Sequence, residues 1–151
     1  KSTLLKEIWK LLAKRTDIKV GYMPQNYEDV LDFSQTPTEF LESQYDKEEQ
    51  TRARMFLGNM KFTADEMLHK ISELSGGQKA KLIFLNMVLK KCDVLILDEP
   101  TRNFSPLSSP VVCKALMNFG GTIISISHDR RYLNDVADIV YVLSPTGLTL
   151  L

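Results

Sequence analysis

The stretch Asp93–Thr101, D-V-L-I-L-D-E-P-T, decides the fold of this chain. Its apolar run, Val94–Leu97, is typical of a strand that is covered on both faces of a sheet. The run ends at two adjacent carboxylates, Asp98 and Glu99. Because open parallel sheets bind ligands beyond the carboxyl ends of their strands, both acids would face a ligand. One acid could hold Mg²⁺ and the other could deprotonate an attacking water, although the pair could equally be a polar turn in which Asp98 caps the next helix.

The composition excludes several classes of protein. The 151 residues are 44% hydrophobic and 25% charged, which is enough for one domain with a core. Nineteen basic residues balance nineteen acidic ones, so no general field attracts nucleic acid. Cys92 and Cys113 lack the spacing of a zinc site or a disulfide framework, and no apolar run approaches the roughly 18 residues of a membrane span. We therefore expect a cytoplasmic protein.

Strands and helices alternate along the chain, which predicts an α/β fold with a mostly parallel sheet and flanking helices. Strands are expected over 19–23, 94–97 and 122–127, and a C-terminal β-hairpin over 139–143 and 148–151. Helices are expected over 2–14, 77–90, 108–118 and 130–136, and an inserted lobe carries helical patterns over 37–44, 47–60 and 64–69. We thus expect a core lobe, about 1–25 and 92–151, and a helical lobe, about 26–91.

A second stretch, L-S-G-G-Q at Leu74–Gln78, precedes a long helical pattern. Ser75 can cap that helix, while Gly76 and Gly77 let backbone N–H groups approach an anion. The helix dipole would stabilise an anion bound there by about 0.3–1 kcal/mol at an exposed site. A glycine turn before a helix is common, but S-G-G-Q shortly before L-I-L-D-E-P is not.

Two further polar residues follow predicted strands. Gln25 comes after K-V-G-Y-M-P, and His128 comes after I-I-S-I-S. Alone, each would be an ordinary loop or structural residue, as we expect for His69 in the helical insert. Since the strands are predicted to be parallel, Gln25 and His128 would lie at the same sheet edge as Asp98 and Glu99.

Together these stretches resemble the nucleotide-binding domain of ATP-binding-cassette (ABC) ATPases, which have the P-loop NTPase fold. The matching motifs are K-S-T-L-L-K (end of Walker A), Y-M-P-Q (Q-loop), L-S-G-G-Q-K-A-K (signature), V-L-I-L-D-E-P-T (Walker B) and S-I-S-H-D-R-R-Y-L (switch histidine). They occur in the family's order over nearly the whole chain. The form of the signature and switch motifs, and Asn103 after D-E-P-T, resemble the ABC-F branch of tandem cassettes. The short stretch between Gln25 and the signature resembles that branch's second cassette.

The resemblance implies a role for each site residue. Lys1 would contact the β and γ phosphates of ATP, Ser2 would bind Mg²⁺ and Thr3 would support the α-phosphate region. Asp98 would hold the metal through water, and Gln25 would complete its shell. Glu99 would be the general base, and His128 would contact the γ-phosphate.

The signature would serve a different site, because in this family it closes over ATP held by a second cassette. The residues concerned are Ser75, Gly76, Gly77 and Gln78. After D-E-P-T the family continues N-H-L-D, whereas this chain has R-N-F-S, so Ser105 replaces an Asp that couples the two sites. Lys1–Thr3 match only the end of Walker A. We therefore expect its glycines upstream of this sequence, and we expect the chain alone to be inactive.

Three functions remain open from the sequence. The favoured one is an ABC-F ATPase that acts on the ribosome, as a translation factor or in antibiotic resistance. The alternative is the ATPase subunit of a membrane transporter, in which the helical lobe should present a groove with exposed apolar residues to a membrane-spanning subunit. The third is a non-catalytic fragment.

Overall fold

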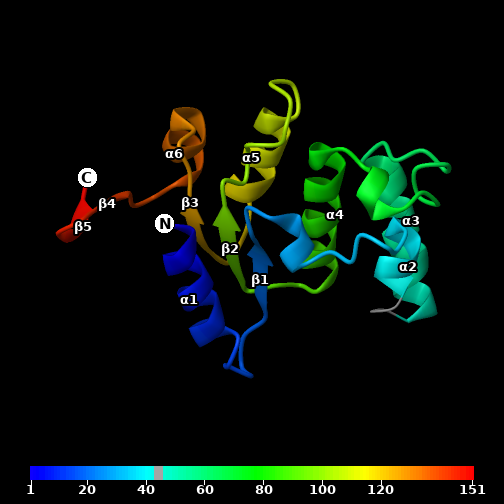
Figure 1. Cartoon of the computed structure of the whole chain (residues 1–151), viewed down its shortest axis with the longest axis horizontal. Helices are drawn as coiled ribbons and strands as arrows, with labels where there is room; N and C mark the ends of the chain where they lie inside the picture. Colours follow the sequence, from blue (N-terminus) through cyan, green and yellow to red (C-terminus); the bar gives the residue numbers. More distant parts are fainter. Residues whose placement is uncertain (43–45) are drawn as a thin grey trace.

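A parallel sheet of three strands forms the centre of the computed structural model, which describes residues 1–42 and 46–151 (Figure 1). The strands β1 (Val20–Met23), β2 (Val94–Asp98) and β3 (Thr122–Ile126) lie in the order β1-β2-β3. Val94 of β2 is in register with Val20 on one side and with Thr122 on the other. Leu95, Ile96 and Leu97 of this central strand are buried, as its apolar run predicts. The expected α/β fold with a parallel sheet is confirmed.

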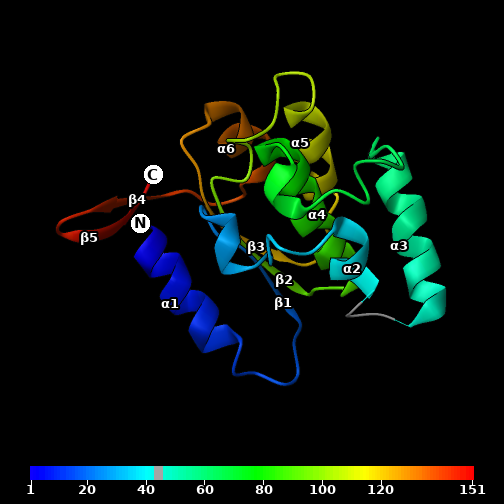
Figure 2. The same cartoon turned by 45° about the vertical axis from the view of Figure 1, so that its right-hand side comes forward.

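Helices cover both faces of this sheet. The helices α4 (Gly76–Leu89) and α5 (Ser109–Met117) connect neighbouring strands in the same direction, so right-handed crossovers place both on one face. On the opposite face lies α1 (Ser2–Leu12), and α6 (Arg130–Val136) packs against α5 (Figure 2). Trp9 of α1 stacks on Tyr22 of β1, with ring centroids 4.9 Å apart.

The helical lobe contains fewer helices than its sequence pattern predicts. It consists of η1 (Tyr27–Asp29), α2 (Pro37–Glu42), α3 (Lys47–Asn59) and η2 (Ile71–Glu73), followed by α4. The pattern over 37–44 is helical to Glu42, and its last two positions lie outside the described residues.

The expected helix over 64–69 is wrong, because that stretch forms only a turn. Thr63 and Glu66 cap it reciprocally, since each side chain accepts a hydrogen bond from the other residue's backbone N–H. Thr38 donates to the carbonyl oxygen of Met67 at 2.9 Å, and the backbone at Lys70 is extended. The backbone N–H of Ile71 then donates to the carbonyl oxygen of Gln35. This hydrogen bond directs the chain away from a second helical turn.

One continuous cluster of buried residues joins the sheet to the helical lobe. It includes Met23 and Leu97 from the sheet, Leu82 and Leu85 from α4, and Leu57 from α3. The helix α4 thus packs between the strands and the helical insert. The division into two lobes near residues 26 and 91 stays a prediction, because the packing crosses that boundary.

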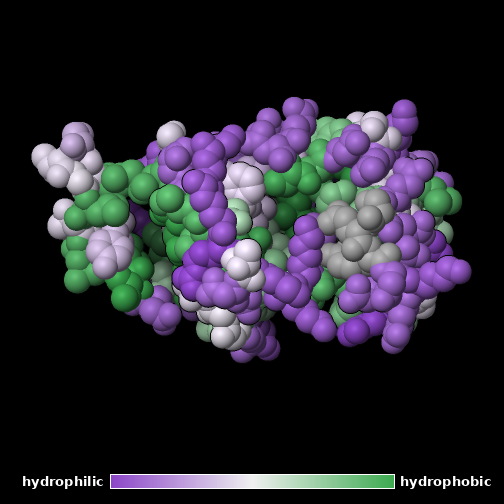
Figure 3. Space-filling model, turned by 90° about the horizontal axis from the view of Figure 1, so that it is seen from below, coloured by the Kyte–Doolittle hydropathy of each residue, from purple (hydrophilic) through white to green (hydrophobic). Residues whose placement is uncertain are grey.

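The C-terminal hairpin is formed by β4 (Tyr141–Ser144) and β5 (Gly147–Leu150), so its first strand begins two residues later than the expected Ile139. Gly147 has φ 127°, which favours glycine at this turn. The hairpin stands apart beyond β3, and hydrophobic surface gathers at that end of the molecule (Figures 1 and 3). Its exposed large hydrophobic side chains are Tyr141, Val142, Leu143, Leu148 and Leu150. Within the described residues, no helix has the length and apolar character to span a bilayer.

Candidate functional site

The carboxyl ends of the three parallel strands place the predicted polar residues along one edge of the sheet. Gln25 follows β1 and is exposed, Asp98 is the last residue of β2, Glu99 follows it, and His128 follows β3. The N-terminus of α1 reaches the same edge, because the Lys1 Nζ atom lies 3.4 Å from His128 Nε2. The structure therefore brings together residues that are more than a hundred positions apart.

Lys1, Glu99 and His128 form what we call the edge cluster. The backbone N–H of His128 donates to Glu99 Oε2 at 3.3 Å, and His128 Nε2 lies 3.7 Å from Glu99 Oε1. The Glu99 side chain is only 16% exposed, whereas that of His128 is 73% exposed. The Glu99 carboxylate is thus held at the sheet edge while the imidazole stays accessible.

The backbone of Glu99 is strained. Its φ is 53°, in the left-handed region that residues other than glycine rarely adopt. A hydrogen bond from Glu99 N to Ile126 O, at 2.9 Å, holds it against the end of β3. Such strain costs of order 1–3 kcal/mol and is concentrated at functional sites, where it orients a side chain.

Asp98 is buried but incompletely satisfied. Its exposure is 4%, and its Oδ2 atom has no hydrogen-bond partner within the described residues. A buried, unpaired carboxylate oxygen is costly, so its presence indicates a site for a cation or a water. Mg²⁺ is held through one or two carboxylates together with phosphates and water, and Asp98 with the Ser2 hydroxyl and the Gln25 amide has the oxygen donors that it prefers.

Ser2 and Thr3 occupy the first turn of α1, and both are exposed. Lys1 is the N-cap residue, and its side chain makes no capping bond. The backbone N–H groups of the first helical turn therefore combine with the Lys1 ammonium to form a site that favours an anion.

The signature residues form a second, separate group at the N-terminus of α4. Gln78 N donates to Ser75 Oγ and Ser75 N donates to Gln78 Oε1, which completes the capping box that Ser75 was expected to begin. The Gln78 amide also donates to Glu66 Oε1 at 2.7 Å. In the described part of the chain, no hydrogen bond or ion pair joins this group to the edge cluster.

Two side-chain contacts at this edge had no signal in the sequence. Thr101 Oγ1 donates to Asp129 Oδ2 at 3.0 Å, and Asn103 Nδ2 donates to Tyr27 Oη at 2.7 Å. Burial would raise the pKa of Asp129, but hydrogen bonds from Thr101 and from two backbone N–H groups of α6 outweigh it and lower that pKa. The partners lie 28 and 76 positions apart, so no local pattern could identify them.

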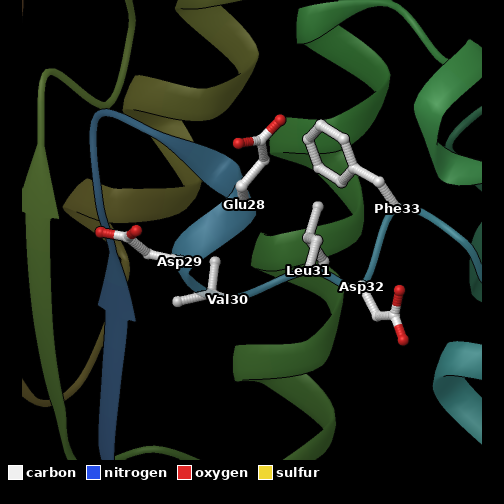
Figure 4. A pocket seen from close by; sticks show the side chains of 6 residues that line it. All are labelled: Glu28, Asp29, Val30, Leu31, Asp32 and Phe33. Carbon is white, nitrogen blue, oxygen red and sulfur yellow. The ribbon is translucent and has the colours of Figure 1, made fainter.

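A shallow hollow of about 530 Å³ is lined by residues 28–33, shortly after Gln25 in the sequence (Figure 4). Three of its lining side chains carry carboxylates, and Lys79 of α4 lies over the Phe33 ring, 4.4 Å from its centroid. The lining residues are Glu28, Asp29, Val30, Leu31, Asp32 and Phe33. The lining of the hollow is therefore half acidic and half apolar.

The fold and the edge cluster define this chain as a P-loop NTPase domain, and comparisons with known proteins give its family. Residues 1–102 match the ABC transporter family, to which the chain belongs. YdiF of Bacillus subtilis (strain 168) is 35% identical over 155 residues, covering 98% of this chain and 24% of YdiF. ABC transporter F family member 5 of Arabidopsis thaliana is 32% identical, covering 93% of this chain and 21% of that protein.

The chain also resembles solved ABC structures in fold. The ATP-binding cassette MJ0796, a dimer in a post-hydrolysis state bound to ADP and Pi, superposes with a TM-score of 0.65 at 19% identity. The match covers 82% of this chain and 58% of that one. The chain is thus an ABC ATPase domain with relatives in the F family, and it spans about a quarter or less of the length of those relatives.

Proposed function

We propose that the protein carrying this chain is an ABC-F-type ATPase that acts on the ribosome, as a translation factor or in ribosomal protection against antibiotics. The F-family relatives and the resemblance of the signature and switch motifs support the branch. ABC domains function with a second cassette or a dimer partner. The protein would therefore need a partner cassette, and Ser75–Gln78 of this chain would close over the ATP that the partner cassette holds.

The edge cluster is the observation that supports hydrolysis. Glu99 is held by the backbone of His128 and lies beside the buried Asp98, so it is oriented to accept a proton from an attacking water. Lys1 and the first turn of α1 would bind the phosphates of ATP, and His128 would contact the γ-phosphate. Asp98, Ser2 and Gln25 would hold Mg²⁺, which would neutralise phosphate charge when bound.

The ATPase proposal is tested by Glu99→Gln in the full-length protein, with the other nucleotide site disabled. The amide keeps the shape of the side chain but removes the base, so kcat should fall by roughly 10²–10⁴-fold while ATP binding is retained. Glu48→Gln, on the exposed first turn of α3, is the matched control. Near-normal hydrolysis by Glu99→Gln would remove Glu99 from this role.

The ribosomal part of the proposal needs a separate experiment. The hydrolysis-deficient Glu99→Gln protein should cosediment with ribosomes in ATP and be released in ADP, because bound ATP keeps the paired cassettes closed. Equal recovery with ribosomes in ATP, in ADP and without nucleotide would contradict it.

A further inference from the structure

Three segments of the proposed site meet at one residue, Asn103. Its Nδ2 atom donates to the hydroxyl oxygen of Tyr27, which follows Gln25 by two residues. Asn103 also lies against the start of α4. A Cβ atom placed on Gly77 would be 2.9 Å from Asn103 O, and one on Gly76 would be 3.2 Å from Asn103 Cγ.

Both partners of this hydrogen bond are anchored. Tyr27 is 8% exposed and belongs to the core cluster, and its burial raises the pKa of the hydroxyl, which therefore stays neutral. Phe104, next to Asn103, packs against Phe84 of α4 with ring centroids 6.1 Å apart. Phe104 N also donates to Thr101 O at 3.1 Å, which closes the turn after Walker B.

We propose that Asn103 is a positioning residue, which acts with Tyr27 to hold the signature against the Walker B turn and the Q-loop. This inference rests on the proposed function, because the signature matters only if it closes on a nucleotide. Because residues 76 and 77 are glycines, Asn103 can lie close to the backbone at the start of α4, with its side chain facing Gly76 and its carbonyl oxygen facing Gly77. The Tyr27 hydroxyl keeps the Asn103 amide in one orientation, and the orientation of the signature follows from it.

The test compares four variants of the full-length protein: Tyr27→Phe, Asn103→Leu, the double variant, and Asn103→His. Histidine restores an N–H donor, whereas leucine fills similar space without one. Tyr141→Phe is the control, since it removes the hydroxyl of an exposed tyrosine in β4.

The first measurement is amide hydrogen exchange of residues 74–78 without nucleotide, so it does not depend on catalysis. Tyr27→Phe and Asn103→Leu should each speed this exchange roughly three- to tenfold, as expected for the loss of one hydrogen bond. The double variant should be no faster than Asn103→Leu, because both changes remove the same contact. Asn103→His should return to near the original rate, and Tyr141→Phe should leave it unchanged.

The second measurement is steady-state ATP hydrolysis together with ATP affinity of this cassette. A positioning role predicts a roughly three- to tenfold fall in kcat for Tyr27→Phe, unchanged ATP affinity, and rescue by Asn103→His. Unchanged exchange in both single variants, or a loss that Asn103→His does not rescue, would overturn the inference. If the unmodified protein does not hydrolyse ATP, the proposed function fails while the exchange data still decide whether Asn103 positions the signature.

Discussion

Gly121 lies immediately before β3, where a methyl group has no space. A Cβ atom on Gly121 would be 2.2 Å from Asp93 O and 2.7 Å from the Phe119 ring. Three hydrogen bonds hold Asp93 in place, so its carbonyl oxygen cannot easily move away from residue 121. Its carbonyl accepts from Thr122 N at 3.0 Å, its N–H donates to Lys19 O at 2.7 Å, and its carboxylate accepts from Lys19 N. This junction joins the starts of all three parallel strands.

The expected cost of Gly121→Ala follows from these contacts. Overpacking a site that cannot relax costs about 1–3 kcal/mol, and losing the Thr122–Asp93 hydrogen bond costs about 1 kcal/mol more. The free energy of unfolding should therefore fall by about 2–4 kcal/mol. Gly120 has no atom within 4 Å of its Cβ position and no positive φ. Gly120→Ala should be neutral or stabilise the fold by up to about 1 kcal/mol, because alanine restricts the unfolded chain.

Urea and thermal unfolding followed by circular dichroism would measure both variants. At about 2–4 °C per kcal/mol for a domain of this size, Gly121→Ala should lower Tm by roughly 4–16 °C. Gly120→Ala, one position away and chemically identical, should not lower it. Equal unfolding midpoints for the two variants would refute the reasoning, since only Gly121 faces a fixed backbone oxygen.

Two further predictions concern the site. Ser75→Ala removes half of the capping box of α4 and should lower the free energy of unfolding by about 1 kcal/mol. Ser108→Ala, the control at an N-cap without a capping bond, should lower it by less. An equal loss of stability in the two variants would contradict the assignment of Ser75 as a cap. Because the pKa of Asp129 is lowered in the folded state, its carboxylate stabilises the fold above its ordinary pKa near 3.8, and this stability is lost as the pH falls through the lowered value. The stability gap between the native protein and Asp129→Asn should therefore shrink from pH 7 to pH 3, and a gap that is constant with pH would exclude a charge effect.

Local patterns were sufficient to predict the class of fold and the sheet edge at which several of the candidate site residues lie. The apolar run before Asp98 required a buried central strand, because only a strand covered on both faces has no polar side. Parallel strands share one carboxyl edge, so Glu99 and His128 were predicted to meet there. Ser75 was predicted as an N-cap from its position alone, since a cap depends on neighbours three residues away.

Tertiary contacts decided the features that these patterns missed. The stretch 64–69 has helical spacing, but bonds from Thr38 and back to residue 35 limit it to a turn. Leu11 fits the apolar stripe of α1 yet is 66% exposed. Spacing cannot reveal which surface a helix meets.

The contact between Tyr27 and Asn103 shows the same limit at the site. Its partners lie 76 positions apart, after the neighbouring strands β1 and β2, and Tyr27 is buried in the core cluster. A sequence records the period and the caps of each segment, which depend on neighbours a few residues away. The partners of a side chain depend on how whole segments pack, and that is settled only when the chain closes around a common core.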